Sequence, residues 1–182
     1  MPATLAIARP APGEFFEYYG RYIDLVPGDD AMPALRDQVK DTVRLLEPLD
    51  ESKALRRYAP GKWSVKEVVG HLADSERVFA YRALRIGRGD TTPLAGFDEN
   101  EYVPVARFDA RPLPDILHEF ENVRAASLAL FRGMDEQALR RRGTANDKEI
   151  SVRALAWILT GHELHHRKIL IEKYGVGRGK IS

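Results

Sequence analysis

The sequence predicts an all-α fold: a four-helix bundle with a short extra N-terminal helix and a long connection between the second and third bundle helices. Four segments of helical length carry apolar residues at intervals of three and four, which is the spacing of an amphipathic helix that packs in a bundle. No segment alternates apolar and polar residues convincingly, so a sheet is not expected.

The N-terminal part is expected to be a loose arm and a short helix, within a single domain that spans residues 1–182. Residues 1–13 are rich in Ala and Pro, which favours an unstructured arm. Residues 15–26 hold five aromatic side chains and are predicted to form a short helix that closes over the bundle. The Pro-Gly-Asp-Asp run at residues 27–30 breaks this helix.

The first two bundle helices have clear apolar stripes. The first is predicted over residues 32–49, with apolar side chains at helical spacing. The second begins at Ser64, where Ser64 and Glu67, three residues later, form the pattern of a capping box. It is expected to end near Ile86, because a Gly-Arg-Gly run follows at residues 87–89.

The third and fourth bundle helices are predicted over residues 113–131 and 151–174, the last ending before Gly175. Residues 88–111 form the long connection between the second and third helices. Connections of this length are functional or disordered in many domains. The acidic residues and the tyrosine in this one are compatible with a roof over a site or a subunit contact, and equally with a solvated loop.

Composition restricts the class of protein. Lys and Arg number 28 and Asp and Glu 27, a net charge of +1, so nucleic acid and anionic membrane are not expected as partners. The chain has no cysteine, which excludes disulfides, thiolate metal ligands and a cysteine nucleophile. Neither a signal peptide pattern nor a membrane-spanning stretch is recognisable, so we expect a cytoplasmic protein.

Histidines on the fourth helix predict a metal site. The run Gly-His-Glu-Leu-His-His at residues 161–166 places His162 and His166 four residues apart, on the same helical face as the apolar stripe. A lone histidine there would be read as a core residue, but two buried imidazoles need partners that one shared metal ion supplies. His71, at the border of the apolar stripe of the second helix, is the expected third ligand.

The same run matches the His-Glu-x-x-His pattern of zinc proteases, but that interpretation fails. Such a protease needs a third ligand after its helix, and no histidine follows His166. The later carboxylate of Glu172 lies on the same predicted helix. A site shared between the second and fourth helices is the better prediction.

Two carboxylates near these histidines are candidates for proton transfer. Glu163 flanks the ligand face, where it is either a base or a polar residue at a helix seam, and His165 has the same two interpretations. Asp74 lies one turn beyond His71 and is either a supporting carboxylate or the partner of Arg77 in a surface ion pair.

Two further ionisable residues lie on the predicted second and third helices. Arg82, on the face of His71, is a candidate for an anionic group of the substrate, although a surface ion pair is the more common fate of such a residue. His118, beside two glutamates on the third helix, is expected at the surface.

Two motifs resemble those of the DinB/YfiT-like superfamily. The first is Trp-Ser-Val-Lys-Glu-Val-Val-Gly-His-Leu-Ala-Asp-Ser-Glu at residues 63–76, and the second is the histidine run at residues 161–166. The resemblance covers about residues 26–174. It implies a four-helix bundle, a divalent metal held by His71, His162 and His166, and a homodimer.

The resemblance also suggests a range of functions. The superfamily includes thiol-dependent S-transferases, a mycothiol-dependent isomerase and members described as metal-dependent hydrolases. We therefore expect a three-His site, with zinc or nickel bound, that acts on a small molecule by hydrolysis or by transfer of a low-molecular-weight thiol. Asp74 or Glu163 would assist proton transfer. The alternatives are a non-catalytic metal-binding stress-response protein and a metal-free bundle.

Overall fold

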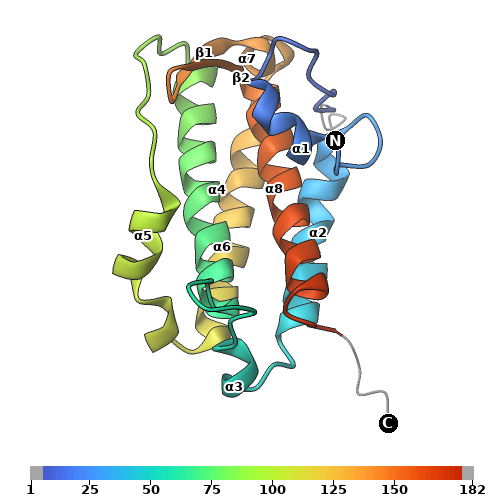
Figure 1. Cartoon of the computed structure of the whole chain (residues 1–182). Helices are drawn as coiled ribbons and strands as arrows, with labels where there is room; N and C mark the ends of the chain where they lie inside the picture. The colour runs from blue at the N-terminus through green and yellow to red at the C-terminus, as the bar shows by residue number, and fades with distance from the viewer. Residues whose placement is uncertain (1–5, 178–182) are drawn as a thin grey trace.

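The computed structural model describes residues 6–177 and contains the predicted four-helix bundle. Its long helices are α2 (Ala31–Leu46), α4 (Val65–Gly87), α6 (Leu113–Arg132) and α8 (Val152–Glu172) (Figure 1). The fold class predicted from apolar spacing is therefore confirmed.

The order of the helices in the bundle explains the long connection. In Figure 1, α2 and α8 run downward while α4 and α6 both run upward, and α4 packs against α6 and α8. Helix α4 has 23 residues and is about 34 Å long at 1.5 Å per residue. Because α4 and α6 are parallel neighbours, the chain must return along this whole length before α6 begins.

The connection is partly helical, which the sequence did not predict. Helix α5 (Glu99–Ala106) and the 3-10 turn η2 (Phe108–Ala110) lie on the outer side of α4 (Figure 1). The Asp98 side chain accepts a hydrogen bond from the Asn100 amide at the start of α5. Eight residues with Pro104 among them give too short and too irregular an apolar pattern for recognition from sequence.

A small hairpin caps one end of the bundle, and the expectation of no sheet was wrong here. Strands β1 (Arg142–Ala145) and β2 (Lys148–Ser151) pair antiparallel, with Arg142 opposite Ser151. Asn146 and Asp147, both at positive φ, form the turn. Four-residue strands are too short to show a clear alternation of apolar and polar residues. The Asn-Asp pair of the turn was therefore the one sequence feature that could have indicated a hairpin. The short helices α3 (Glu51–Ala54) and α7 (Glu136–Arg140) complete the bundle ends.

The N-terminal segment is packed where a loose arm was expected. Residues 1–5 lie outside the described part of the chain. Ile7 is 1% exposed, and its carbonyl accepts a 2.9 Å hydrogen bond from the Trp157 indole of α8. The backbone amide of Ile7 donates to Asp30 Oδ1 at 2.8 Å. These long-range partners hold residues that local composition marks as unstructured.

The predicted helix over residues 15–26 is shorter than expected. It consists of the 3-10 turn η1 (Glu17–Tyr19) and helix α1 (Gly20–Ile23), which lies across α8 (Figure 1). Its position agrees with the expected role of covering the bundle. No helix within residues 6–177 has both the length and the apolar character needed to cross a bilayer.

Candidate metal centre

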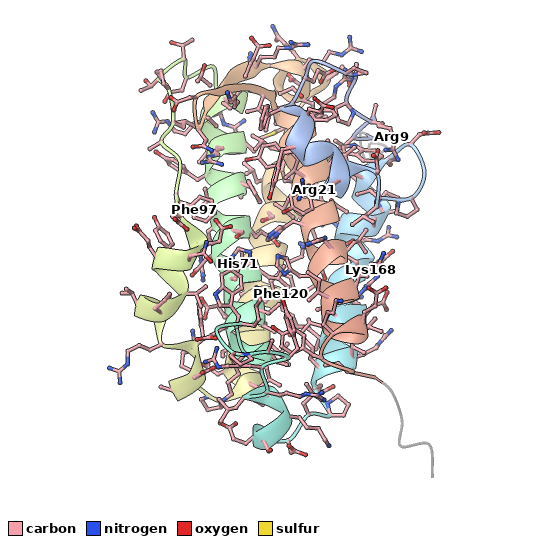
Figure 2. All side chains as sticks on the ribbon, viewed as in Figure 1. Arg9, Arg21, His71, Phe97, Phe120 and Lys168 are labelled. Carbon is pink, nitrogen blue, oxygen red and sulfur yellow. The ribbon has the colours of Figure 1, made fainter. Side chains whose placement is uncertain are left out.

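Three histidines from two helices meet at one point of the bundle. His71 comes from α4, and His162 and His166 come from successive turns of α8. His162 Nε2 lies 3.1 Å from His71 Nε2 and 3.1 Å from His166 Nε2. One ring nitrogen from each histidine falls within 4.8 Å of the other two. Figure 2 labels His71 on α4, about halfway along the bundle, and its contact with His162 directs its ring towards α8.

Glycine precedes a histidine in both motifs, because other elements pack directly on the helix there. A Cβ at Gly161 would collide with the Tyr22 carbonyl of α1. A Cβ at Gly70 would collide with the Phe108 ring of η2. The two glycines therefore let α1 and η2 cover α8 and α4 beside His162 and His71.

The environment keeps the three rings neutral. Burial lowers the pKa of His71 to about 4. Burial, and then the neighbouring histidines, hold the pKa values of His162 and His166 well below the usual range. Neutral imidazole is the form that coordinates metal. Ser75 Oγ lies 3.3 Å from His71 Nδ1, which orients that ring with Nε2 towards the cluster.

The donor set fits a divalent cation better than it fits hydrogen bonds alone. A ring nitrogen carries either one proton or one in-plane lone pair, so His162 Nε2 cannot bond properly to two neighbours at once. Nitrogens bound to one tetrahedral zinc ion at about 2.0–2.1 Å lie roughly 3.3 Å apart. The two observed separations of 3.1 Å are close to this value.

Two cavities border the histidine cluster, one at His71 and His162 and the other at His166. A cavity of about 300 Å³ is lined by His71, His162, Ser75 and Arg82. Much of its remaining wall is aromatic, from Phe16, Tyr18, Tyr19, Tyr22, Phe79 and Phe97. A second cavity, of about 220 Å³, is lined by His166 and by other residues that include Trp63, Tyr58, Tyr174 and Asn100. The cluster is therefore accessible to small molecules.

Asp74 points to a different part of the surface. Its Oδ1 accepts a hydrogen bond from Arg77 Nη1 at 3.2 Å, the ion pair considered as the alternative from sequence. Burial raises the pKa of Asp74. Its side chain lines a separate hollow beside α5, with Glu101 and Tyr102. The predicted role of Asp74 in proton transfer stays a prediction, and these contacts do not favour it.

Glu163 lies at a helix seam, buried in an ionic network. The side chain is 1% exposed, and Oε1 accepts a 2.6 Å hydrogen bond from Thr42. Oε2 accepts from Gln38 and lies 2.8 Å from Arg124 Nη1. Both carboxylate oxygens are thus occupied by α2 and α6. The predicted catalytic role of Glu163 stays a prediction. The contacts of its side chain favour the alternative, a polar residue at the seam between helices.

The other two histidines lie outside the cluster. His165 is half-buried, its ring centroid is 5.3 Å from that of Tyr22, and burial lowers its pKa. His118 is exposed on α6, as expected from its acidic neighbours.

Sequence reasoning missed several residues around the site. Trp63, whose ring centroid is 4.7 Å from that of His71, begins the first motif, but the sequence did not predict its contact with the site. The partner of Glu163 on α6, Arg124, lies on the buried face of that helix. Arg124 could have been found from the sequence, because it is a charged residue at a core-facing position of the predicted third helix. Phe97 and Asn146, which also line the first cavity, lie in a connection and a turn that carry no helical pattern.

A model of the DinB superfamily matches residues 34–170. The chain belongs to the DinB superfamily. The match spans α4, α6 and most of α2 and α8, and it includes all three clustered histidines. The family resemblance inferred from the two motifs is confirmed. Among curated proteins, no match to this DinB chain was found.

Solved structures agree on the fold. One similar structure is YfiT from Bacillus subtilis, described as a probable metal-dependent hydrolase with an unusual four-helix bundle topology. It has a TM-score of 0.71 and 19% identity, covering 92% of this chain and 94% of YfiT. A second is the mycothiol-dependent maleylpyruvate isomerase, with a TM-score of 0.66 and 15% identity. That match covers 81% of this chain and 60% of the isomerase.

Proposed function

We propose that this DinB protein binds one divalent metal ion, zinc or nickel, through His71, His162 and His166, and acts on a small molecule as a hydrolase or a thiol S-transferase. The observation that carries the proposal is the meeting of three neutral imidazole nitrogens beside open cavities. A structural metal site is closed by protein ligands, whereas a catalytic site keeps a position open. The cavities therefore favour catalysis over a non-catalytic metal-binding stress-response role.

The ligands suit the activation of a nucleophile. A bound divalent ion would supply positive charge that favours the anionic form of water or of a thiol near neutral pH. Three neutral imidazoles add no negative charge to offset it. If His71 Nε2 holds the ion, its Nδ1 carries the proton and would donate it to Ser75 Oγ, 3.3 Å away, which would hold the ring in place. The aromatic side chains in the wall of the larger cavity would contact an apolar part of the substrate.

The size of the cavity beside His166 supports thiol transfer as one of the two proposed reactions, the other being hydrolysis. Water takes about 30 Å³ in the liquid, whereas the smaller cavity holds about 220 Å³. That leaves room for a low-molecular-weight thiol on one side of the cluster and a second reactant on the other. The chain has no cysteine, so any thiol comes from solution. A structural relative named as mycothiol-dependent adds support to this choice.

The partners follow from the same features and stay predictions. Cavities of this size admit small molecules. The net charge of +1 gives no attraction for nucleic acid or for an anionic membrane. The homodimer implied by the family resemblance is part of the proposal.

Activity assays with two probe reactions test the proposal. Zinc-loaded or nickel-loaded protein is assayed for hydrolysis of 4-nitrophenyl acetate and for conjugation of chlorodinitrobenzene with cysteine or other small thiols. We expect one of these reactions to be lost after chelation and in His162→Ala, and to persist in the control His118→Ala, because His118 is exposed on α6 and lies outside the cluster. Rates that are the same in native protein and His162→Ala would contradict a metal-dependent enzyme.

A further inference from the structure

Arg82 stands out among the buried cations of the chain. Within residues 6–177, the buried Lys and Arg side chains are Lys66, Arg82 and Arg124. Lys66 pairs with Glu51, and Arg124 pairs with Glu76 and Glu163. Arg82 is 4% exposed, yet no carboxylate in the described part of the chain lies within ion-pairing distance of it. A buried charge without a counter-charge is costly, so this exception needs an explanation.

The protein itself uses little of the hydrogen-bonding capacity of Arg82. Its Nη2 donates to the Ala95 carbonyl at 2.9 Å, and its guanidinium carbon lies 5.8 Å from the centroid of the Phe97 ring. A guanidinium carries five N–H donors, and among the described residues this carbonyl is the one acceptor. Burial lowers the pKa of Arg82, which reflects the loss of hydration of its charge.

The free side of Arg82 belongs to the cavity that reaches the histidines. Arg82 and Ser75 line this cavity together with His71 and His162. Phe97, which Figure 2 shows on the segment that leads into α5, forms part of the same wall. Glu99 also lines the cavity, but it is half-exposed and makes no ion pair with Arg82. The cavity thus combines the buried, unpaired charge of Arg82 with aromatic surfaces and with the half-exposed carboxylate of Glu99.

We infer that Arg82 binds the carboxylate of a small substrate with an aromatic or flat apolar body, and holds it beside His71 and His162. The planar guanidinium fork matches a carboxylate with two parallel hydrogen bonds. The aromatic side chains of the wall offer faces and edges to a ring. A cavity of about 300 Å³ limits the substrate to a small molecule. This inference rests on the proposed function, because it assigns the substrate class of that same site.

Binding of benzoate tests the inference. The full chain, both metal-free and zinc-loaded, is titrated by calorimetry with benzoate, with the neutral isostere benzamide and with acetate, which lacks the ring. The metal-free form is needed because a carboxylate can also bind a metal ion directly. In both forms we expect benzoate to bind at least about tenfold more tightly than benzamide or acetate.

Variants of two arginines of α4 locate the binding. Arg82→Gln is expected to weaken benzoate binding by about tenfold or more, because it removes the charge. Arg85→Gln is the matched control, since Arg85 lies on the same helix, pairs with Asp90 in the connection that follows the helix, and does not line the cavity. Its benzoate affinity should equal that of the native protein. Equal affinity for benzoate and benzamide, or no change in folded Arg82→Gln, would overturn the inference.

If Arg82→Gln does not fold, the native protein provides the test. A crystal structure of the native chain with benzoate must place the carboxylate on the Arg82 guanidinium, and any other position overturns the inference. No saturable binding at millimolar benzoate has the same consequence. Metal content measured in parallel separates the two proposals. Benzoate binding without metal uptake would sink the proposed function alone, whereas metal uptake without a benzoate preference would sink this inference alone.

Discussion

His162 is the central residue of the site. Its Nε2 lies 3.1 Å from the corresponding atom of both other histidines, and its ring packs edge-on against Tyr22 and Phe79. The i,i+4 spacing with His166 was readable from sequence, because it depends on one helix. The proposed third ligand, His71, was inferred by pairing two motifs that lie far apart in the chain. Its actual distance from His162 depends on how α4 and α8 pack.

Trp63 provides an optical signal for the site. Its ring centroid lies 4.7 Å from that of His71, whereas Trp157, the second tryptophan of the chain, is fully buried with its indole bonded to Ile7. In Trp157→Phe, added zinc or nickel should change the Trp63 emission, because the ion changes the charge beside the ring. The change should saturate at one equivalent and be absent in Trp157→Phe/His71→Ala. Unchanged emission in protein shown to hold metal would contradict the placement of the ion beside His71.

At the scale of the helices, one buried arginine joins all four members of the bundle. Arg124 of α6 bonds to Glu76 of α4, to the Leu35 carbonyl of α2 and to Glu163 of α8. Sequence did not predict this network, because apolar spacing identifies which face of a helix is buried but not which polar residues on those faces meet. The predicted catalytic use of Glu163 came from its place in the histidine motif alone.

Removal of the arginine should destabilise the bundle strongly. Arg124→Leu leaves two carboxylates buried without their counter-charge, so we expect the free energy of unfolding to fall by about 3–5 kcal/mol. Urea denaturation measures it. Arg77→Leu is the control, because Arg77 forms exposed ion pairs with Asp74 and Glu119 and should change stability by less than about 1 kcal/mol. Similar stability of the two variants would contradict the importance of the network.

The cover of the site depends on the absence of a side chain at Gly161. Gly161→Ala would push α1 away from α8, because the new Cβ would meet the Tyr22 carbonyl. We expect a lower melting temperature and faster amide hydrogen exchange in residues 20–23. Gly133→Ala is the matched control, since its Cβ would make only ordinary contacts of 3.6 Å with the Ala129 and Leu130 carbonyls. Protection of α1 that is the same in both variants would refute this role of Gly161.

At the scale of the whole molecule, the elements that could not be predicted from sequence are those held by long-range contacts. The four helices follow from apolar spacing, and the Ser64–Glu67 capping box is present as expected. The N-terminal segment, α5 and the hairpin carry weak local signals. Their structure depends on partners far away, such as Trp157 for Ile7 and Thr144 for Leu94. Local patterns predict the bundle, while its cover and its buried polar network come from tertiary packing.

Glu14, which joins the N-terminal segment to Ser151 and Arg153, should stop stabilising the fold in acid. Burial alone would raise the pKa of Glu14, but hydrogen bonds from Arg153, Ser151 and the Ala11 amide lower it from 4.5 to about 2. A lowered pKa stabilises the folded state above pH 4.5, and this contribution is lost as the pH falls towards 2. At pH 7, Glu14→Gln should therefore be less stable than native protein by about 1–3 kcal/mol.

Urea denaturation of both proteins across the pH range checks this. The gap in unfolding free energy should be constant at neutral pH and should narrow below about pH 4.5, the ordinary value for a glutamate. A gap that does not depend on pH would mean that the Glu14 charge is not involved.

Metal content tests the central claim most directly. Native protein, His71→Ala, His162→Ala and the control His165→Ala are purified in parallel, incubated with zinc or nickel, freed of excess ion and analysed for metal. We expect about one ion per chain in the native protein and in His165→Ala, and a loss of metal in the two variants from opposite helices. Stoichiometric metal in His71→Ala and His162→Ala, or none in the native protein, would contradict a metal site shared between α4 and α8.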